Sequence, residues 1–183
     1  MAGRPRHGRA QEIKMANDVS ILAKMHAARV QPHAFIHSLK TLNQKSFALV
    51  VKDKKYDQGI GGVVSYWVTG KGKHSHSLVC HVAAKELVLQ NRKVFCLSVA
   101  ELALRGSSEE VTERVGTGYL VVSDVGENTK HYTPAQWDEA QAILLSHLGR
   151  GGGLIMGSAD TKSVEFNYDF LDALAIFESV VVV

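Results

Sequence analysis

The chain has 183 residues, of which 45% are hydrophobic and 21% charged, enough for one globular domain with a hydrophobic core. A net charge of only +3 excludes chains kept unfolded by self-repulsion, and no apolar run approaches the roughly 18 residues of a membrane span. The basic first residues lead into no apolar signal segment, so we expect a cytoplasmic protein without membrane contact. In that reducing compartment, Cys80 and Cys96 are expected to be buried thiols.

Positive charge is concentrated at the start of the chain, where residues 1–58 carry eleven Lys and Arg against four acidic residues. A basic arm followed by a basic helix is typical of attraction to phosphate backbones, although a solvated terminus explains the composition equally well. The candidate DNA-binding residues are Arg4, Arg6, Arg9 and Lys14. Loosely periodic apolar residues predict a helix over 15–30, which either binds a partner or covers the core.

The alternation of short apolar runs with helical segments beyond residue 63 predicts a parallel α/β sheet. The expected strands are residues 63–68, 94–97, 119–122, 154–156 and 180–183. Because their apolar residues are consecutive, both faces of the sheet should be covered by helices. We therefore divide the chain into a basic arm and helical segment, 1–40, and an α/β domain, 41–183.

Helix signals fall between the expected strands. One helix is expected over 77–89. The best-marked helix starts after Thr133, with Pro134 at its first position and Gln136 completing a capping box, and stops at Gly149. A second capping-box pattern, Ser107 with Glu110, precedes a short helix. The glycines of 151–153 predict a turn into the following strand.

The segment after the first strand lies where phosphate-binding loops carry the pattern G-x-x-x-x-G-K-[ST]. It reads Thr69, Gly70, Lys71, Gly72, Lys73, His74, Ser75, His76, Ser77. Gly70 and Ser77 match the first glycine and the final hydroxyl residue of the pattern. Ser75 replaces the second glycine and His76 replaces the lysine, so the motif alone is a weak signal.

The wider sequence resembles the bacterial replicative-helicase loaders of the DnaC type and their IstB relatives, a compact group of AAA+ proteins. The resemblance is carried by Gly70-Lys71, by 85–89, by 92–94, by 98–102, by 119–126 and by 152–158, in matching order and spacing. Residues 44–58 resemble the helix that precedes the first strand in this family. The resemblance covers roughly residues 40 to 183.

The resemblance implies a three-layer P-loop NTPase-like fold (AAA+/RecA-like) with a five-stranded parallel sheet, helices on both faces and no C-terminal lid domain. It implies a nucleotide site made of Gly70, Lys71, Gly72, Lys73, His74, Ser75, His76, Ser77, Ser123 and Asp124. Asp124 stands at the position of the catalytic Glu and Ser158 at the sensor position. The implied partners are a DnaB-like replicative helicase of the host and single-stranded DNA. The small size suits a protein encoded by a phage or plasmid.

This sequence departs from the family at the positions that bind nucleotide and Mg²⁺ or take part in hydrolysis. His76 stands where the family has Lys, and an imidazole is mostly neutral at pH 7; Ser123 stands where the family has the Mg²⁺-organising Asp. A positive φ at Ser75 would cost about 1–2 kcal/mol. Asp124 should point to the other face of its strand and so not replace the missing Asp. The segment 165–174, where the family supplies arginines to a neighbouring subunit, contains no Arg. These losses predict a pseudo-ATPase with at most weak binding of ATP and Mg²⁺.

A cluster of possible zinc ligands overlaps this loop: His74, His76, Cys80 and His81. The i, i+4 spacing of His76 and Cys80 is ligand-like. No second cluster completes a tetrahedral site, and Cys80 fits the apolar interior of a helix packed on a sheet. We therefore favour packing over zinc binding.

Three functional classes follow from the sequence. The preferred one is a degenerate helicase-loader-like protein that works by binding helicase or single-stranded DNA. The second is an unusual active ATPase that uses Lys71 or Lys73 with Asp124, which substitution of both lysines would test. The third is a nucleotide-independent DNA-binding module, marked by steep salt dependence. The sequence offers no clear aromatic stacking platform for bases.

Overall fold

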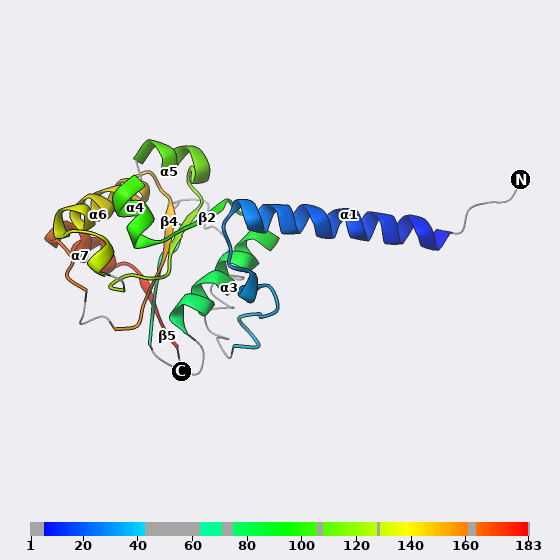
Figure 1. Ribbon diagram of the computed structural model, residues 1–183, viewed down its shortest axis with the longest axis horizontal. Coiled ribbons are helices and arrows are strands. Elements are labelled where there is room, and N and C mark those ends of the chain that lie inside the picture. The colour runs from blue at the N-terminus through cyan, green and yellow to red at the C-terminus, as the bar shows by residue number, and fades with distance from the viewer. Residues whose placement is uncertain are drawn as a thin grey trace, which may run out of the picture.

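The computed structural model describes residues 6–42, 63–70, 75–105, 108–127, 129–160 and 164–182, with side chains in the first segment from residue 17 onward (Figure 1). The helices are α1 (Arg6–Ala27), α3 (His76–Leu89), α4 (Val99–Arg105), α5 (Ser108–Val115), α6 (Pro134–Gly149) and α7 (Tyr168–Leu174), with short 3-10 turns η1 (Pro32–Ala34) and η2 (Thr129–His131). The strands are β1 (Tyr66–Thr69), β2 (Val94–Leu97), β3 (Tyr119–Val122), β4 (Gly153–Ser158) and β5 (Glu178–Val181).

The five strands form one parallel sheet in the order β2-β3-β4-β1-β5. This confirms the predicted parallel five-stranded α/β sheet. Two of the expected strands, 94–97 and 119–122, have the predicted bounds. The first starts three residues later than predicted, and β5 lies two residues earlier. The expected helix over 44–58 and Ser107 of the second capping box lie outside the described residues.

Helices cover both faces of the sheet, which makes a three-layer fold (Figure 1). Successive strand residues point to opposite faces. In β3, Tyr119 and Val121 therefore pack with α1, η1 and α3, whereas Leu120 and Val122 pack with α4 to α7. Because both faces are buried, every strand residue in β3 is apolar. The same alternation continues past the end of β3 and determines where the polar site residues point.

Two capping boxes stabilise the N-termini of helices on the face of the sheet that packs with α4 to α7. The predicted one is confirmed in α6, where the Thr133 hydroxyl accepts from the Gln136 N–H and the Gln136 side chain accepts from the Thr133 N–H. At α4, Ser98 and Glu101 make the same reciprocal pair of hydrogen bonds. The sequence analysis did not single out this second box.

α1 begins at Arg6, nine residues before the helix predicted over 15–30, and projects away from the sheet (Figure 1). It is anchored to the core by buried Met25 in its last turn and by buried Ala28 directly after its end. The Ala28 carbonyl also accepts a hydrogen bond from the Cys96 N–H on the edge strand β2, at 2.9 Å. Among the described residues, no helix combines the length and apolar character that a bilayer crossing requires.

Candidate functional site: a degenerate nucleotide pocket

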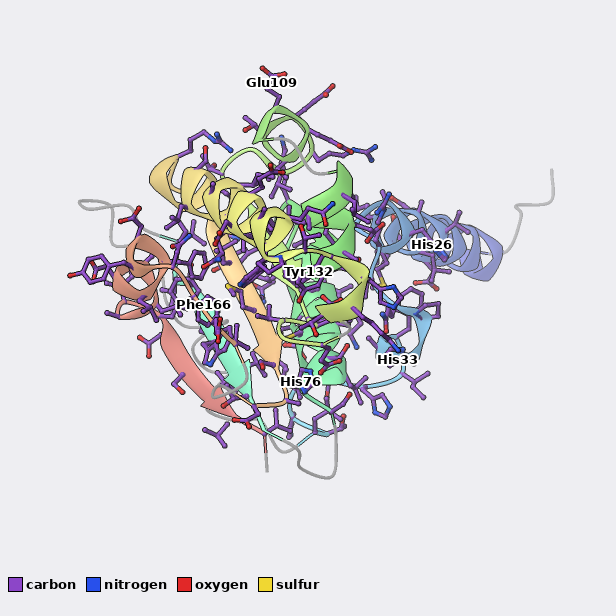
Figure 2. The ribbon with its side chains drawn as sticks, turned by 60° about the vertical axis from the view of Figure 1, so that its left-hand side comes forward. His26, His33, His76, Glu109, Tyr132 and Phe166 are labelled. Carbon is purple, nitrogen blue, oxygen red and sulfur yellow. The ribbon has the colours of Figure 1, made fainter. Side chains whose placement is uncertain are left out.

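The sequence-predicted site residues gather at the carboxyl edge of the sheet, where ligands bind in open α/β folds. The strand order places β1, β4 and β3 side by side, so the segments that follow them are neighbours. His76 marks this edge in Figure 2, at the end toward which the strand arrows point. Gly70 ends β1 with φ of 119°, and a Cβ there would lie 2.6 Å from the Val182 carbonyl oxygen, so this turn requires glycine.

Ser75 is the N-cap of α3 rather than a strained loop residue. Its φ is −70° and its ψ is 148°, and its hydroxyl accepts a hydrogen bond from the Leu78 N–H at 3.1 Å. The expected cost of a positive φ at this position is therefore wrong. The reason is that the chain enters α3 through an ordinary extended N-cap, which suits serine better than glycine.

Ser77, on the first turn of α3, is joined to Ser123 at the end of β3. The Ser77 hydroxyl donates to the Ser123 hydroxyl at 3.1 Å, and the ring Nε2 of His81 lies 3.3 Å from the same Ser123 oxygen. Ser77 and His81 are four residues apart, so they occupy one face of the helix. Three polar side chains therefore satisfy one another across the space between α3 and the sheet.

The tautomer of His81 follows from its second contact. The backbone N–H of Gln31 donates to His81 Nδ1 at 3.3 Å, so a neutral ring carries its proton on Nε2 and donates it to Ser123. Burial lowers the pKa of His81 to about 4, and the neighbouring His33 adds to the effect. His81 is thus a neutral link between the segment before η1, the helix α3 and the end of β3.

Asp124 lies on the opposite face of the sheet from Ser123, as the alternation of β3 predicts. Its carboxylate accepts a hydrogen bond from the Val99 N–H at 2.9 Å, at the start of α4. Burial raises the pKa of Asp124, against the lowering effect of that hydrogen bond. The carboxylate therefore supports the N-terminus of α4 and is not joined to Ser77.

His76, at the position of the family's lysine, faces a carboxylate. Its Nε2 lies 2.7 Å from Glu127 Oε1, and the ring is almost fully buried, whereas Glu127 is partly exposed. The ring N–H is not aligned for a hydrogen bond, so this is a contact of charges when His76 is protonated. A carboxylate at this position repels phosphate, which is the opposite of what a phosphate loop requires.

Cys80, another of the zinc candidates, packs against the sheet. A Cβ on Gly157 of β4 would lie 2.7 Å from Cys80 Sγ and 3.2 Å from His76 Cδ2, so this glycine allows α3 to approach the sheet closely. Cys80 is fully buried, and burial raises the pKa of its thiol. The described residues contain no group of three His, Cys, Asp or Glu side chains that could hold a metal ion. His74 lies outside them.

Ser158, which the resemblance assigns to the sensor position, is buried at the end of β4 and hydrogen-bonded within its own turn. Its hydroxyl donates to the Asp160 carbonyl at 2.9 Å and accepts from the Asp160 N–H. The central loop residues Lys71, Gly72, Lys73 and His74 lie outside the described residues, as do the side chains of Arg4, Arg6, Arg9 and Lys14.

The described residues do not fit a Mg²⁺-bound nucleotide. Mg²⁺ prefers carboxylate and phosphate oxygens in octahedral geometry. At the two positions where the resemblance implies Mg²⁺-organising groups, the described residues are the neutral hydroxyls of Ser77 and Ser123, which are hydrogen-bonded to each other. Two acids at this edge have other contacts, since Asp124 accepts a hydrogen bond from the N-terminus of α4 and Glu127 lies against His76.

Sequence reasoning missed the roles of three residues. It treated His81 only as a possible metal ligand, although its i, i+4 relation to Ser77 signalled a shared helix face. No local signal pointed to Glu127 or to the Gln31 backbone, because their contacts with α3 join segments distant in sequence.

Similarity to known structures is consistent with this architecture. DnaA from Aquifex aeolicus bound to AMPPCP aligns with a TM-score of 0.56 and 12% identity, over 84% of this chain and 51% of that chain. A DNA replication initiation factor aligns with a TM-score of 0.53 and 12% identity, over 81% and 47%. Drosophila ORC bound to poly(dA/dT) DNA and Cdc6 aligns at 0.41 and 14% identity, over 88% and 30%, and carries no weight here.

The fold is therefore P-loop NTPase-like and similar to that of these two structures. The chain spans about half the length of the first two neighbours. No protein family matches the sequence, and no curated protein proves similar to it.

Proposed function

We propose that this chain is a DNA-replication accessory protein of the helicase-loader type, which acts by binding and does not hydrolyse ATP. The observation that supports this most directly is the hydrogen bond between the Ser77 and Ser123 hydroxyls, at 3.1 Å. It pairs two neutral groups at the positions where a P-loop ATPase places a hydroxyl and an acid around Mg²⁺. The AAA+ fold is retained as a scaffold.

Two observations support a role in DNA replication. The fold is similar to that of DnaA and to that of a protein described as a DNA replication initiation factor. The sequence resembles helicase loaders over roughly residues 40 to 183. A replicative helicase and single-stranded DNA are therefore the partners to test.

Binding of a hexameric replicative helicase to the immobilised full chain tests this proposal. We expect the same affinity with no nucleotide, with ATP and Mg²⁺, and with a Lys71→Ala/Lys73→Ala variant, because a scaffold needs no bound phosphate. Lys40→Ala/Lys130→Ala is the control for the same loss of charge. Helicase binding that requires ATP and disappears with the loop lysines would contradict the proposal and favour the active ATPase.

A further inference from the structure

A basic groove lies at the amino edge of the sheet, opposite the candidate nucleotide site. It has a volume of about 490 Å³ and is bounded by the last turn of α1, the turn from α3 into β2, and α5. The lining residues are Lys24, Ala27, Ala28, Val88, Asn91, Arg92, Lys93, Val94 and Arg114. Four of these nine are cations and none is acidic. In Figure 1, the end of α1 and α5 lie at the same end of the sheet.

The conformation of the chain at the C-terminus of α3 determines where two of these cations, Arg92 and Lys93, lie. Asn91 adopts φ of 58°, its N–H bonds the Val88 carbonyl, and the Arg92 N–H bonds the Leu87 carbonyl. This is a Schellman ending, which satisfies the last carbonyls of α3. It turns the chain sharply, so that Arg92 and Lys93 stand at the entrance to β2.

Two of the four positive charges in the groove, Lys24 and Arg114, have neutral partners. The Lys24 ammonium donates to the Asn91 side-chain oxygen at 3.1 Å. The Arg114 guanidinium lies 5.2 Å above the centre of the Phe95 ring. These contacts position the two side chains without cancelling their charge. The acidic residues of α5, Glu109, Glu110 and Glu113, do not line the groove.

We infer that this groove binds the phosphate backbone of DNA. Cations from three separate segments converge on one concave surface, as electrostatic binding of a phosphodiester chain requires. None of the described residues that line the groove is aromatic, so they offer bases no stacking partner, and we expect binding to be independent of sequence. The choice of DNA among polyanions rests on the proposed function.

The location also makes DNA binding independent of the nucleotide site. The groove lies at the amino edge of the sheet, before β2, whereas Ser77 and Ser123 lie at the carboxyl edge. It adjoins the C-terminal end of α1, the helix that contains Arg6, Arg9 and Lys14. DNA bound in the groove therefore lies close to the C-terminal end of α1.

Fluorescence anisotropy of the full chain with labelled single-stranded and duplex oligonucleotides tests the groove. The variant is Lys24→Gln/Lys93→Gln, both exposed, and the matched control is Lys40→Gln/Lys130→Gln. We expect the groove variant to lose at least tenfold in affinity near 0.1 M salt. The slope of log K against log salt should fall by about 1.4 for single strands or 1.8 for duplex. The control should remain within twofold of the wild type.

A third variant separates the groove from the arm: Arg4→Gln/Arg6→Gln/Arg9→Gln/Lys14→Gln. If only this variant loses affinity, the groove assignment is wrong while DNA binding by the protein stands. If the groove variant loses helicase binding and keeps DNA binding, the groove is a protein interface and the inference is overturned. If the wild type binds no DNA at low salt, the inference also fails, and the helicase experiment still tests the proposed function.

Discussion

The hydroxyl of Ser77 in α3 and that of Ser123 at the end of β3 are hydrogen-bonded at 3.1 Å, and His81 approaches the same Ser123 oxygen at 3.3 Å. This contact occupies the place where a P-loop ATPase needs a hydroxyl and a carboxylate free to organise a metal ion. It joins the first turn of α3 to the end of β3. The same contact makes Ser123 important for stability.

Ser123→Ala should destabilise the fold. It removes the Ser77 hydrogen bond and leaves the buried His81 Nε2–H without an acceptor, which costs about 1–3 kcal/mol. Urea unfolding followed by circular dichroism measures the change. Ser179→Ala, at an exposed position of β5, is the control and should remain within about 0.5 kcal/mol of the wild type. Equal stability of the two variants would show that the network contributes nothing.

Acid should destabilise the protein through His81. Its pKa is about 4 in the folded protein, and about 6.5 is expected in the unfolded chain. Between these values only the unfolded chain binds the proton. Stability is therefore full above pH 6.5 and falls as the pH drops toward 4, by up to roughly 3 kcal/mol. The contribution of Asp124 to the pH dependence of stability has the opposite sign. Because its pKa is raised in the folded protein, the folded state holds the proton at a pH where the unfolded chain has lost it.

Comparing urea unfolding at pH 5 and pH 7.5 checks this dependence. His81→Gln removes the titrating ring and should flatten the profile. A smaller slope should remain, because burial also lowers the pKa of His147, which acts in the same direction. A His81→Gln profile as steep as that of the wild type would assign the acid sensitivity to other groups.

Gly157→Ala should be costly because α3 passes close to the sheet there. A Cβ would lie 2.7 Å from Cys80 Sγ and 3.2 Å from the Ser123 carbonyl oxygen, so we expect a loss of about 1–3 kcal/mol. Gly149→Ala is the matched control. At the end of α6 its Cβ would meet nothing within 4 Å, and it should be neutral or stabilise by up to about 1 kcal/mol. Similar stability of both variants would contradict the close approach.

Both cysteines should react slowly with a thiol reagent in the folded protein. Cys80 and Cys96 are free and buried, and burial raises the pKa of Cys96 to about 12, so little thiolate forms at neutral pH. Labelling followed by mass spectrometry should show no modification in native buffer. In about 6 M guanidinium, which unfolds the protein, it should show two modifications. Rapid native labelling of Cys80 would mean that α3 separates readily from the sheet.

The sequence predicted the sheet because its signals are local. The apolar runs at 94–97 and 119–122 and the Thr133 capping box correspond directly to β2, β3 and the start of α6. The alternation of side chains along a strand also predicted that Asp124 would point to the opposite face of the sheet from Ser123.

The network of contacts at the site was less predictable. The contact between His76 and Glu127 joins a helix to a distant loop, and the bond from Gln31 to His81 uses a backbone N–H, which carries no sequence signal. The basic groove depends on Lys24, Lys93 and Arg114 converging from separate segments, and only the fold brings them together.

The most direct test of the central claim is calorimetric titration of the nucleotide-free chain with ATP, in the presence and absence of Mg²⁺. We expect no binding up to millimolar ATP, because the Ser77 and Ser123 hydroxyls satisfy each other and Glu127 faces His76. Micromolar binding that depends on Mg²⁺ would contradict this account. It would show that the residues at this edge rearrange to hold a nucleotide, and the protein would then belong with the active ATPases.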